Sequence, residues 1–138
     1  MSRGKGRMEV CKMIWKEISP YFKPHEIFSP EIMAKGYWHL VNLEMLKAAN
    51  RTRDILGYPC YINHDKYWLR GVVSASEVLT RDGAKYTTHV QGHAIDLSCY
   101  DVTIDELAAA MKEAGFKYLI KYRSWVHGDM AERGRIII

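Results

Sequence analysis

Two short stretches of the sequence carry side-chain types that bind metal ions. The first, residues 87–96, contains His89, Gly92, Ala94 and Asp96. Zinc accepts imidazole and carboxylate donors in proteins, and a glycine lets the chain turn sharply after the first ligand. On a strand that begins just before Ala94, the side chains of Ala94 and Asp96 point to one side, which leaves space above the small alanine. We therefore interpret His89 and Asp96 as candidate metal ligands.

A third ligand is expected from the second stretch, which reads Trp125-Val126-His127-Gly128-Asp129 and has the composition of a strand. The alternation of side chains along a strand places Trp125, His127 and Asp129 on one face. With His127 as the third protein ligand, the fourth position of a tetrahedral zinc ion stays open for water, which is typical of a catalytic site. Asp129, about 7 Å along the strand from His127, is near enough to serve that water or to support a ligand.

The same spacing is compatible with structural roles. His, Gly and Asp occur together in many loops, so Asp96 is also a candidate cap and Trp125 a candidate core residue. The remaining histidines that we considered have no partner at a ligand spacing, and we interpret them as surface, capping or supporting groups: His25, His39 and His64.

Together the two stretches resemble a family of zinc peptidases that includes D-alanyl-D-alanine carboxypeptidases and phage L-alanyl-D-glutamate endolysins, with the Hedgehog signalling domain as a structural relative. The family motif is Ser-x-His-x-x-Gly-x-Ala-x-Asp, and the matching residues here are Thr87, His89, Gly92, Ala94 and Asp96. The second motif, an aromatic residue before a late ligand histidine, is met by Trp125 and His127. The resemblance extends to residues 22–26, similar to the opening segment of the family, and to residues 53–59, similar to its passage from helix to strand.

This resemblance implies a Zn²⁺ cofactor bound by His89, Asp96 and His127. It also implies hydrolysis of peptide bonds in peptidoglycan stem peptides, by a phage or prophage protein acting as a carboxypeptidase or an endopeptidase. The implied fold is a small α+β domain with zinc on one face of an antiparallel sheet. The residues that hold the substrate are expected to be Arg70, which would pair with a carboxylate, and Thr87, which would hydrogen-bond the substrate backbone. Exposure of Arg70 to solvent and support of the loop by Thr87 are the alternatives.

Two departures from the family concern catalysis. Relatives carry an acidic residue three residues before the last ligand, or a Glu six residues before it, where this chain has Ser124 and Lys121. A hydrolase of this type needs a carboxylate that takes a proton from the zinc-bound water and returns it to the leaving amine. Asp129 is the candidate for this catalytic role, and orientation of His127 is its alternative. A zinc-binding module of a virion or cell wall that has lost turnover is therefore the second functional hypothesis.

The sequence patterns indicate which elements position these residues. Helices are expected over residues 8–18, from Pro24, from Pro30, over residues 38–56 and from residue 104, where Thr103 and Glu106 form a capping box, to Gly115. The helix over residues 38–56 should bury one face made of Leu40, Leu43, Leu46, Ala49 and Leu56. Strands are expected over residues 58–63, 93–99, 116–122, 124–129 and 135–138, which gives an α+β fold with a small, largely antiparallel sheet and helices packed on the side away from the zinc.

The bulk properties fit one domain. With 138 residues, 48% hydrophobic and 26% charged, the chain has the composition of an ordinary globular protein. We expect a flexible basic leader over residues 1–8 and a single zinc peptidase-like domain over residues 9–138. The three cysteines are widely spaced and are expected to be reduced and mostly buried.

Charge and apolar patterning narrow the partners and the place of synthesis. A formal net charge of +4, partly in the leader, does not by itself favour nucleic-acid binding, which remains a third hypothesis. We expect no membrane span and no secretory signal, hence synthesis in the cytoplasm. Action would then take place at the bacterial cell wall after release, or on the virion, and the oligomeric state is not determined by the sequence.

Overall fold

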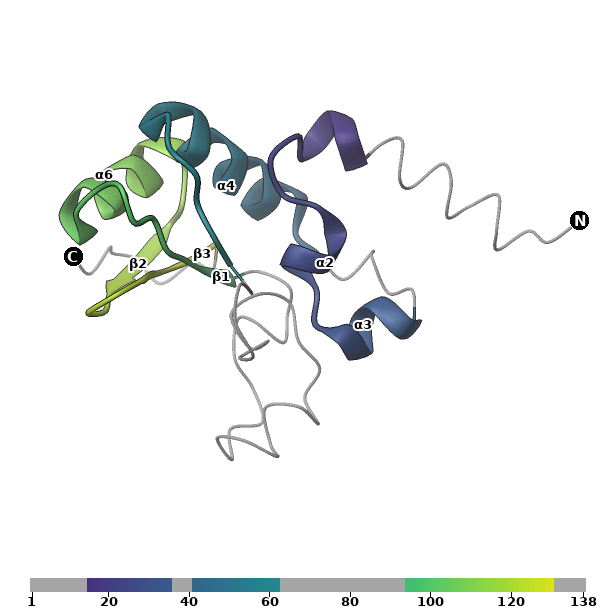
Figure 1. Cartoon of the computed structure of the whole chain (residues 1–138). Helices are drawn as coiled ribbons and strands as arrows, with labels where there is room; N and C mark the ends of the chain where they lie inside the picture. Colours follow the sequence, from purple (N-terminus) through teal and green to yellow (C-terminus); the bar gives the residue numbers. More distant parts are fainter. Residues whose placement is uncertain (1–14, 36–40, 63–93, 131–138) are drawn as a thin grey trace, which may run out of the picture.

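The computed structural model describes residues 15–35, 41–62 and 94–130 (Figure 1). Its helices are α2 (Pro24–Ile27), α3 (Pro30–Lys35), α4 (Leu43–Leu56) and α6 (Ile104–Ala114), and its strands are β1 (Ala94–Leu97), β2 (Tyr118–Lys121) and β3 (Val126–Asp129). The strands form an antiparallel sheet in the order β1-β3-β2. The α+β class and the small antiparallel sheet expected from the sequence are therefore confirmed.

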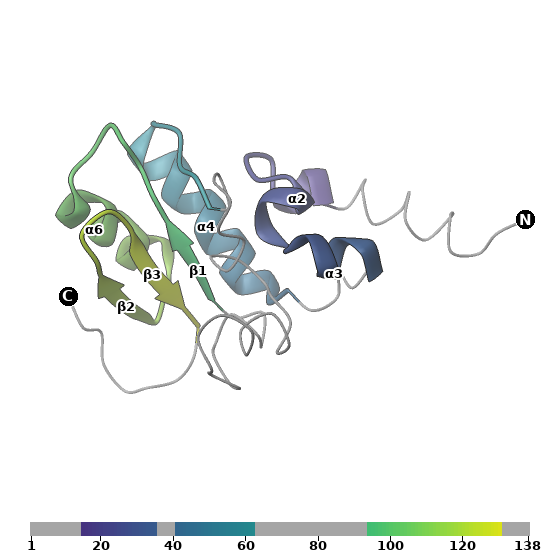
Figure 2. The same cartoon turned by 60° about the horizontal axis from the view of Figure 1, so that its bottom comes forward.

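The helices α4 and α6 lie side by side on one face of the sheet, and α2 and α3 lie beyond the far side of α4 (Figures 1 and 2). The core between α6 and the sheet contains apolar side chains that are 0% exposed, among them Leu107, Met111, Leu119 and Val126. Burial of these side chains is the main stabilising contribution in such a layer. It also fixes which face of each strand turns away from the helices.

Helix α4 begins at Asn42, whose side chain accepts a hydrogen bond from the Met45 amide, and ends at Gly57, which adopts the left-handed conformation. Leu46 and Ala49 are buried as expected. Leu43 is a correction, because it is 50% exposed rather than part of the buried face. The buried face is centred near Met45, and Leu43 precedes Met45 by two residues, which is about 200° around the helix.

A buried polar network joins the segment before α2 to α4. The side-chain oxygen of Asn50 accepts a hydrogen bond from the Tyr21 amide at 3.0 Å, and its amide nitrogen donates to the Ser19 hydroxyl at 3.0 Å. The same nitrogen donates to the Leu46 carbonyl at 2.8 Å, so the 5% exposed Asn50 side chain has partners for both of its polar atoms.

The helix starts expected at Pro24 and Pro30 are both confirmed.

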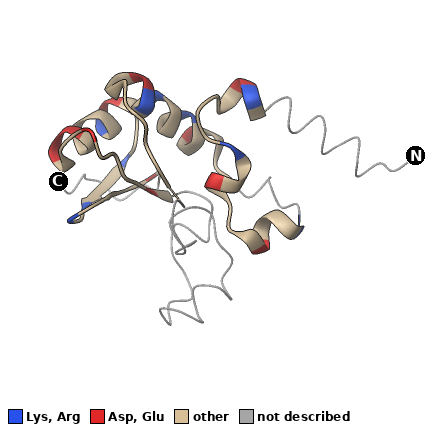
Figure 3. Cartoon of the chain, in the orientation of Figure 1, with Lys and Arg blue, Asp and Glu red and all other residues tan. Residues whose placement is uncertain are grey.

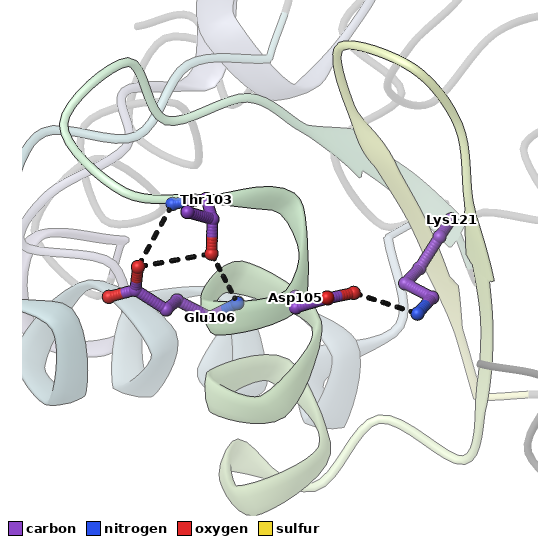
Figure 4. Close-up of polar contacts among 4 residues, drawn as sticks. All are labelled: Thr103, Asp105, Glu106 and Lys121. Atoms are coloured by element: carbon purple, nitrogen blue, oxygen red, sulfur yellow. Dashed lines mark hydrogen bonds and ion pairs between the residues drawn. The ribbon is translucent and has the colours of Figure 1, made fainter.

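The expected capping box of α6 is confirmed and is drawn in Figure 4. The Thr103 hydroxyl accepts from the Glu106 amide at 3.1 Å, and the Glu106 carboxylate accepts from the Thr103 amide at 3.3 Å. At the other end Gly115 is left-handed, and the guanidinium Nε of Arg51 on α4 donates to the Ala114 carbonyl at 2.8 Å. Both ends of α6 are therefore satisfied, one of them from the neighbouring helix.

The strand predictions are confirmed for β1, β2 and β3, which lie inside the expected ranges. The strand expected over residues 58–63 is represented by one isolated bridge between Tyr61 and Ser98, beside β1. Residues 15–18 are helical, as expected for the end of the first helix. The leader, most of that helix, residues 36–40 and the strand expected over residues 135–138 lie outside the described residues.

Charged residues of both signs are spread over the helices, and the strands are mostly neutral (Figure 3). Within residues 15–35, 41–62 and 94–130, no helix combines the length and the apolar character that crossing a membrane requires.

Candidate metal centre

The sheet brings two of the sequence-predicted ligands face to face. Strands β1 and β3 are antiparallel neighbours, with Asp96 opposite His127 and Ala94 opposite Asp129. Side chains of directly paired residues point to the same face of a sheet. Ala94 and Asp96 share one face, as expected, and so do His127 and Asp129. Because the two pairs stand opposite each other, all four side chains lie on the same face of the sheet.

The imidazole of His127 lies between two carboxylates. Its Nδ1 is 3.0 Å from Oδ1 of Asp96, and its Nε2 is 2.7 Å from Oδ2 of Asp129. The exposed fractions of the three side chains are 10% for His127, 15% for Asp96 and 0% for Asp129. A neutral imidazole has a single N–H, so it can donate to one of these carboxylates only. Both contacts are favourable when the ring is protonated or when a cation lies between Asp96 and the ring.

These contacts set the charge of the ring in the metal-free protein. Burial by itself lowers the pKa of His127, but the hydrogen bonds to Asp129 and Asp96, with the charges of both carboxylates, outweigh it and raise the pKa to about 9. The ring is then an imidazolium at neutral pH, and the three side chains carry a net charge of minus one. A cluster of this kind attracts a cation, which would displace the ring proton on binding.

The donor geometry fits a zinc ion bound by Asp96 and His127. Two ligand atoms of one tetrahedral zinc ion, each bonded at about 2.0–2.1 Å, lie about 3.3 Å apart. The 3.0 Å between Nδ1 of His127 and Oδ1 of Asp96 is close to this separation. In the described part of the chain no group of three or more His, Cys, Asp or Glu side chains is arranged to hold a metal ion. The expected third ligand, His89, lies outside that part.

Asp129 occupies the other side of the imidazole ring. Its carboxylate contacts Nε2, whereas Asp96 contacts Nδ1, so the ring separates the two carboxylates. A carboxylate that accepts from the second nitrogen of a metal-binding histidine fixes the tautomer and the ring orientation. Of the two roles that the sequence left open for Asp129, this position favours orientation of His127 over proton transfer at a metal-bound water.

Gly128, between His127 and Asp129, has a role that the sequence analysis did not identify. A Cβ atom at this position would lie 2.6 Å from Cε of Met111 and 2.8 Å from Cδ1 of Phe116. A side chain at this position would therefore overlap the side chains of Met111 and Phe116 unless these move. The signal was present in the sequence as a glycine flanked by two polar strand residues, because alternation turns that glycine toward the helices.

Lys121 and Ser124 occupy the two positions where the family that the sequence resembles carries an acidic residue. Lys121 pairs with Val126 in the β2–β3 register, whereas Ile120 pairs with His127, so Lys121 belongs to the opposite face of the sheet. Its ammonium group forms an ion pair with Asp105 of α6 at 2.8 Å, as Figure 4 shows. Ser124 is exposed in the turn between β2 and β3.

The β2–β3 turn also carries two aromatic rings. Tyr122 and Trp125 stack with ring centroids 4.9 Å apart and an angle of 20° between their planes. The Tyr122 amide donates to the Trp125 carbonyl at 2.9 Å, which closes the turn. Trp125 is only half-buried, so the alternative of a core tryptophan is not met. The stacked pair instead covers the end of the hairpin that leads into His127.

The remaining predicted site residues, Arg70, Thr87 and His89, lie outside the described residues, so the structure neither brings them together nor separates them. Comparisons of the chain with models of protein families, with curated proteins and with solved structures gave no match.

Proposed function

We propose that the chain is a zinc metallopeptidase that hydrolyses peptide bonds in peptidoglycan stem peptides. The observation that carries the proposal is the arrangement of Asp96, His127 and Asp129, in which one nitrogen of the imidazole faces a candidate ligand and the other faces an orienting carboxylate. This is the arrangement that metal-binding histidines commonly have.

In this proposal His89, Asp96 and His127 bind Zn²⁺. When bound, zinc polarises the scissile carbonyl and lowers the pKa of a water molecule that it coordinates. Asp129 keeps Nδ1 of His127 directed at Asp96 by accepting a hydrogen bond from Nε2–H of the ring. Arg70 binds a substrate carboxylate, and Thr87 hydrogen-bonds the peptide backbone. The protein would be phage- or prophage-encoded, made in the cytoplasm and active at the cell wall after release or as part of the virion.

The contacts of Asp129 and Lys121 favour a second function. The carboxylate of Asp129, which the sequence offered as the proton carrier, is engaged by His127, and Lys121 is engaged by Asp105 on the opposite face. A zinc-binding module without turnover, in a virion or cell-wall attachment component, needs the ligands and not the proton carrier. Both functions predict zinc binding, so hydrolysis is what distinguishes them.

The test is a metal titration combined with a hydrolysis assay. Purified protein is loaded with one equivalent of Zn²⁺ and incubated with peptidoglycan and with D-alanyl-D-alanine peptides, and newly released amino groups are quantified. The peptidase proposal requires release that His127→Ala abolishes and that the exposed-histidine control His25→Ala retains. Zinc binding that raises the melting temperature without any release would support the module instead. Absence of zinc binding to the folded protein would refute both.

A further inference from the structure

Two buried cysteines lie opposite each other beside strand β1. Tyr61 and Ser98 form an antiparallel bridge in which each amide donates to the carbonyl of the other, at 2.8 Å and 2.9 Å. Partners in an antiparallel pair move in opposite directions along the two chains, so the next pair is Cys60 with Cys99. The rings of Tyr61 and Tyr100, with centroids 5.4 Å apart, show that the two segments stay together past the bridge.

The position of this pair suits a disulfide. Because Tyr61 and Ser98 exchange both hydrogen bonds, the adjacent Cys60–Cys99 pair is of the non-hydrogen-bonded type, with Cα atoms typically about 4.5 Å apart. Disulfides join Cα atoms about 4.4–6.8 Å apart. The two side chains point to the same, buried side, with 5% of Cys60 and 9% of Cys99 exposed, and both thiols are free. The Cys60 thiol donates to the Tyr58 carbonyl at 3.8 Å, within its own segment.

We propose that Cys60 and Cys99 form a reversible cross-strand disulfide when the protein meets a low-molecular-weight disulfide such as oxidised glutathione. The two thiols are oxidised, one S–S bond forms between them, and the glutathione disulfide is reduced to two glutathione thiols that take up the two protons. The bond would join the segment after α4 to the segment after β1. It is independent of the proposed peptidase function, because neither cysteine belongs to the candidate metal centre.

Thiol–disulfide exchange proceeds in two steps through a mixed disulfide. The thiolate of one cysteine attacks glutathione disulfide and releases one glutathione thiolate. The second cysteine then loses its proton and attacks the protein sulfur of the mixed disulfide, and the second glutathione thiolate leaves. Burial raises the pKa of the Cys60 thiol to about 12, with a further contribution from the charge of Cys99.

The test uses the full chain with Cys11→Ser, which removes the third cysteine. The folded, zinc-free protein is incubated with oxidised glutathione, remaining thiols are alkylated, and the intact mass and the cysteine peptides are determined. We expect a mass lower by two hydrogen atoms and a peptide linkage between Cys60 and Cys99, both reversed by dithiothreitol. Two results would overturn the proposal. One is that the folded protein does not form this linkage while unfolded protein reacts fully, and the other is that two glutathione adducts accumulate.

Two single variants in the same Cys11→Ser background test the assignment of the bond to this pair. Cys60→Ser and Cys99→Ser should each lack the intramolecular linkage and hold at most one glutathione. An intact mass lower by two hydrogen atoms in either variant would overturn the assignment. The melting temperature of the protein that keeps both Cys60 and Cys99 tests the geometry of the bond. Oxidation closes the loop between these two cysteines and should raise the melting temperature by about 10 °C over that of the reduced protein. A lower melting temperature of the oxidised protein would show that the native positions do not accommodate the bond.

Discussion

Asp129→Asn is the substitution that separates the two roles considered for Asp129. Asparagine has the shape of aspartate, so it can still accept a hydrogen bond from Nε2 of His127, but it brings no negative charge to the 2.7 Å contact. Removal of such a partner typically weakens metal binding about 10- to 100-fold. This corresponds to about 1.4–2.7 kcal/mol in the free energy of zinc binding. On the proposed function, the loss arises because His127 becomes a weaker and less well-oriented ligand.

The assay is competition for zinc between the protein and a chromophoric chelator, followed by hydrolysis rates at saturating zinc. If Asp129 orients His127, the zinc Kd of Asp129→Asn rises about 10- to 100-fold, and much of the hydrolysis returns at saturating zinc. If Asp129 carries the proton, the zinc Kd stays within about threefold while kcat falls about 10²- to 10⁴-fold. The second result would refute our assignment. Asp101→Asn, in an exposed turn, is the matched control and should change neither quantity.

Three further predictions follow from the same region and from the core. The pKa of His127 rises from 6.5 unfolded to about 9 folded, so the metal-free protein should lose about 3 kcal/mol of its free energy of unfolding as the pH rises from 6.5 through 9. Urea titrations with a chelator present should show this loss, and a larger stability at pH 9.5 than at pH 6 would contradict it. Gly128→Ala should lower the free energy of unfolding by about 1–3 kcal/mol because its Cβ would overlap Met111, whereas the exposed Ser124→Ala should change it by less than about 0.5 kcal/mol. Leu46→Ala should cost about 2–5 kcal/mol and the half-exposed Leu43→Ala less than about 1 kcal/mol by thermal or urea unfolding, and equal losses would mean that α4 presents a different face to the core.

Features that depend on neighbours in sequence could be predicted well. The capping box of Thr103 and Glu106 spans three residues, and both of its hydrogen bonds form within one turn of α6. The glycine ends of α4 and α6 and the proline starts of α2 and α3 have the same local origin. The buried face of α4 was partly mistaken because residues three apart drift by about 60° around a helix, so Leu43 lies about 120° from Ala49 and outside the buried face.

The candidate metal centre depended on both kinds of information. Alternation along single strands predicted that Ala94 would share a face with Asp96, and His127 with Asp129. It could not show that β1 pairs with β3 or that Asp96 stands opposite His127, because strand order and register depend on which faces the whole domain buries. The sequence could not decide whether Asp129 orients His127 or carries a proton. That choice depends on the orientation of the His127 ring, which determines which nitrogen contacts which carboxylate.

The sequence by itself determined the class of the fold, the ends of the main helices and the residue types that suit a zinc site, because these depend on local hydrogen bonding and on periodicity. The tertiary structure alone decided that His127 lies between Asp96 and Asp129, that Gly128 lies against Met111 of α6, and that Cys60 lies opposite Cys99. Apart from the contact of His127 with Asp129, two residues away on β3, these contacts join residues far apart in the chain. They are set by the close packing of α6 and the sheet, which no single segment of the sequence specifies.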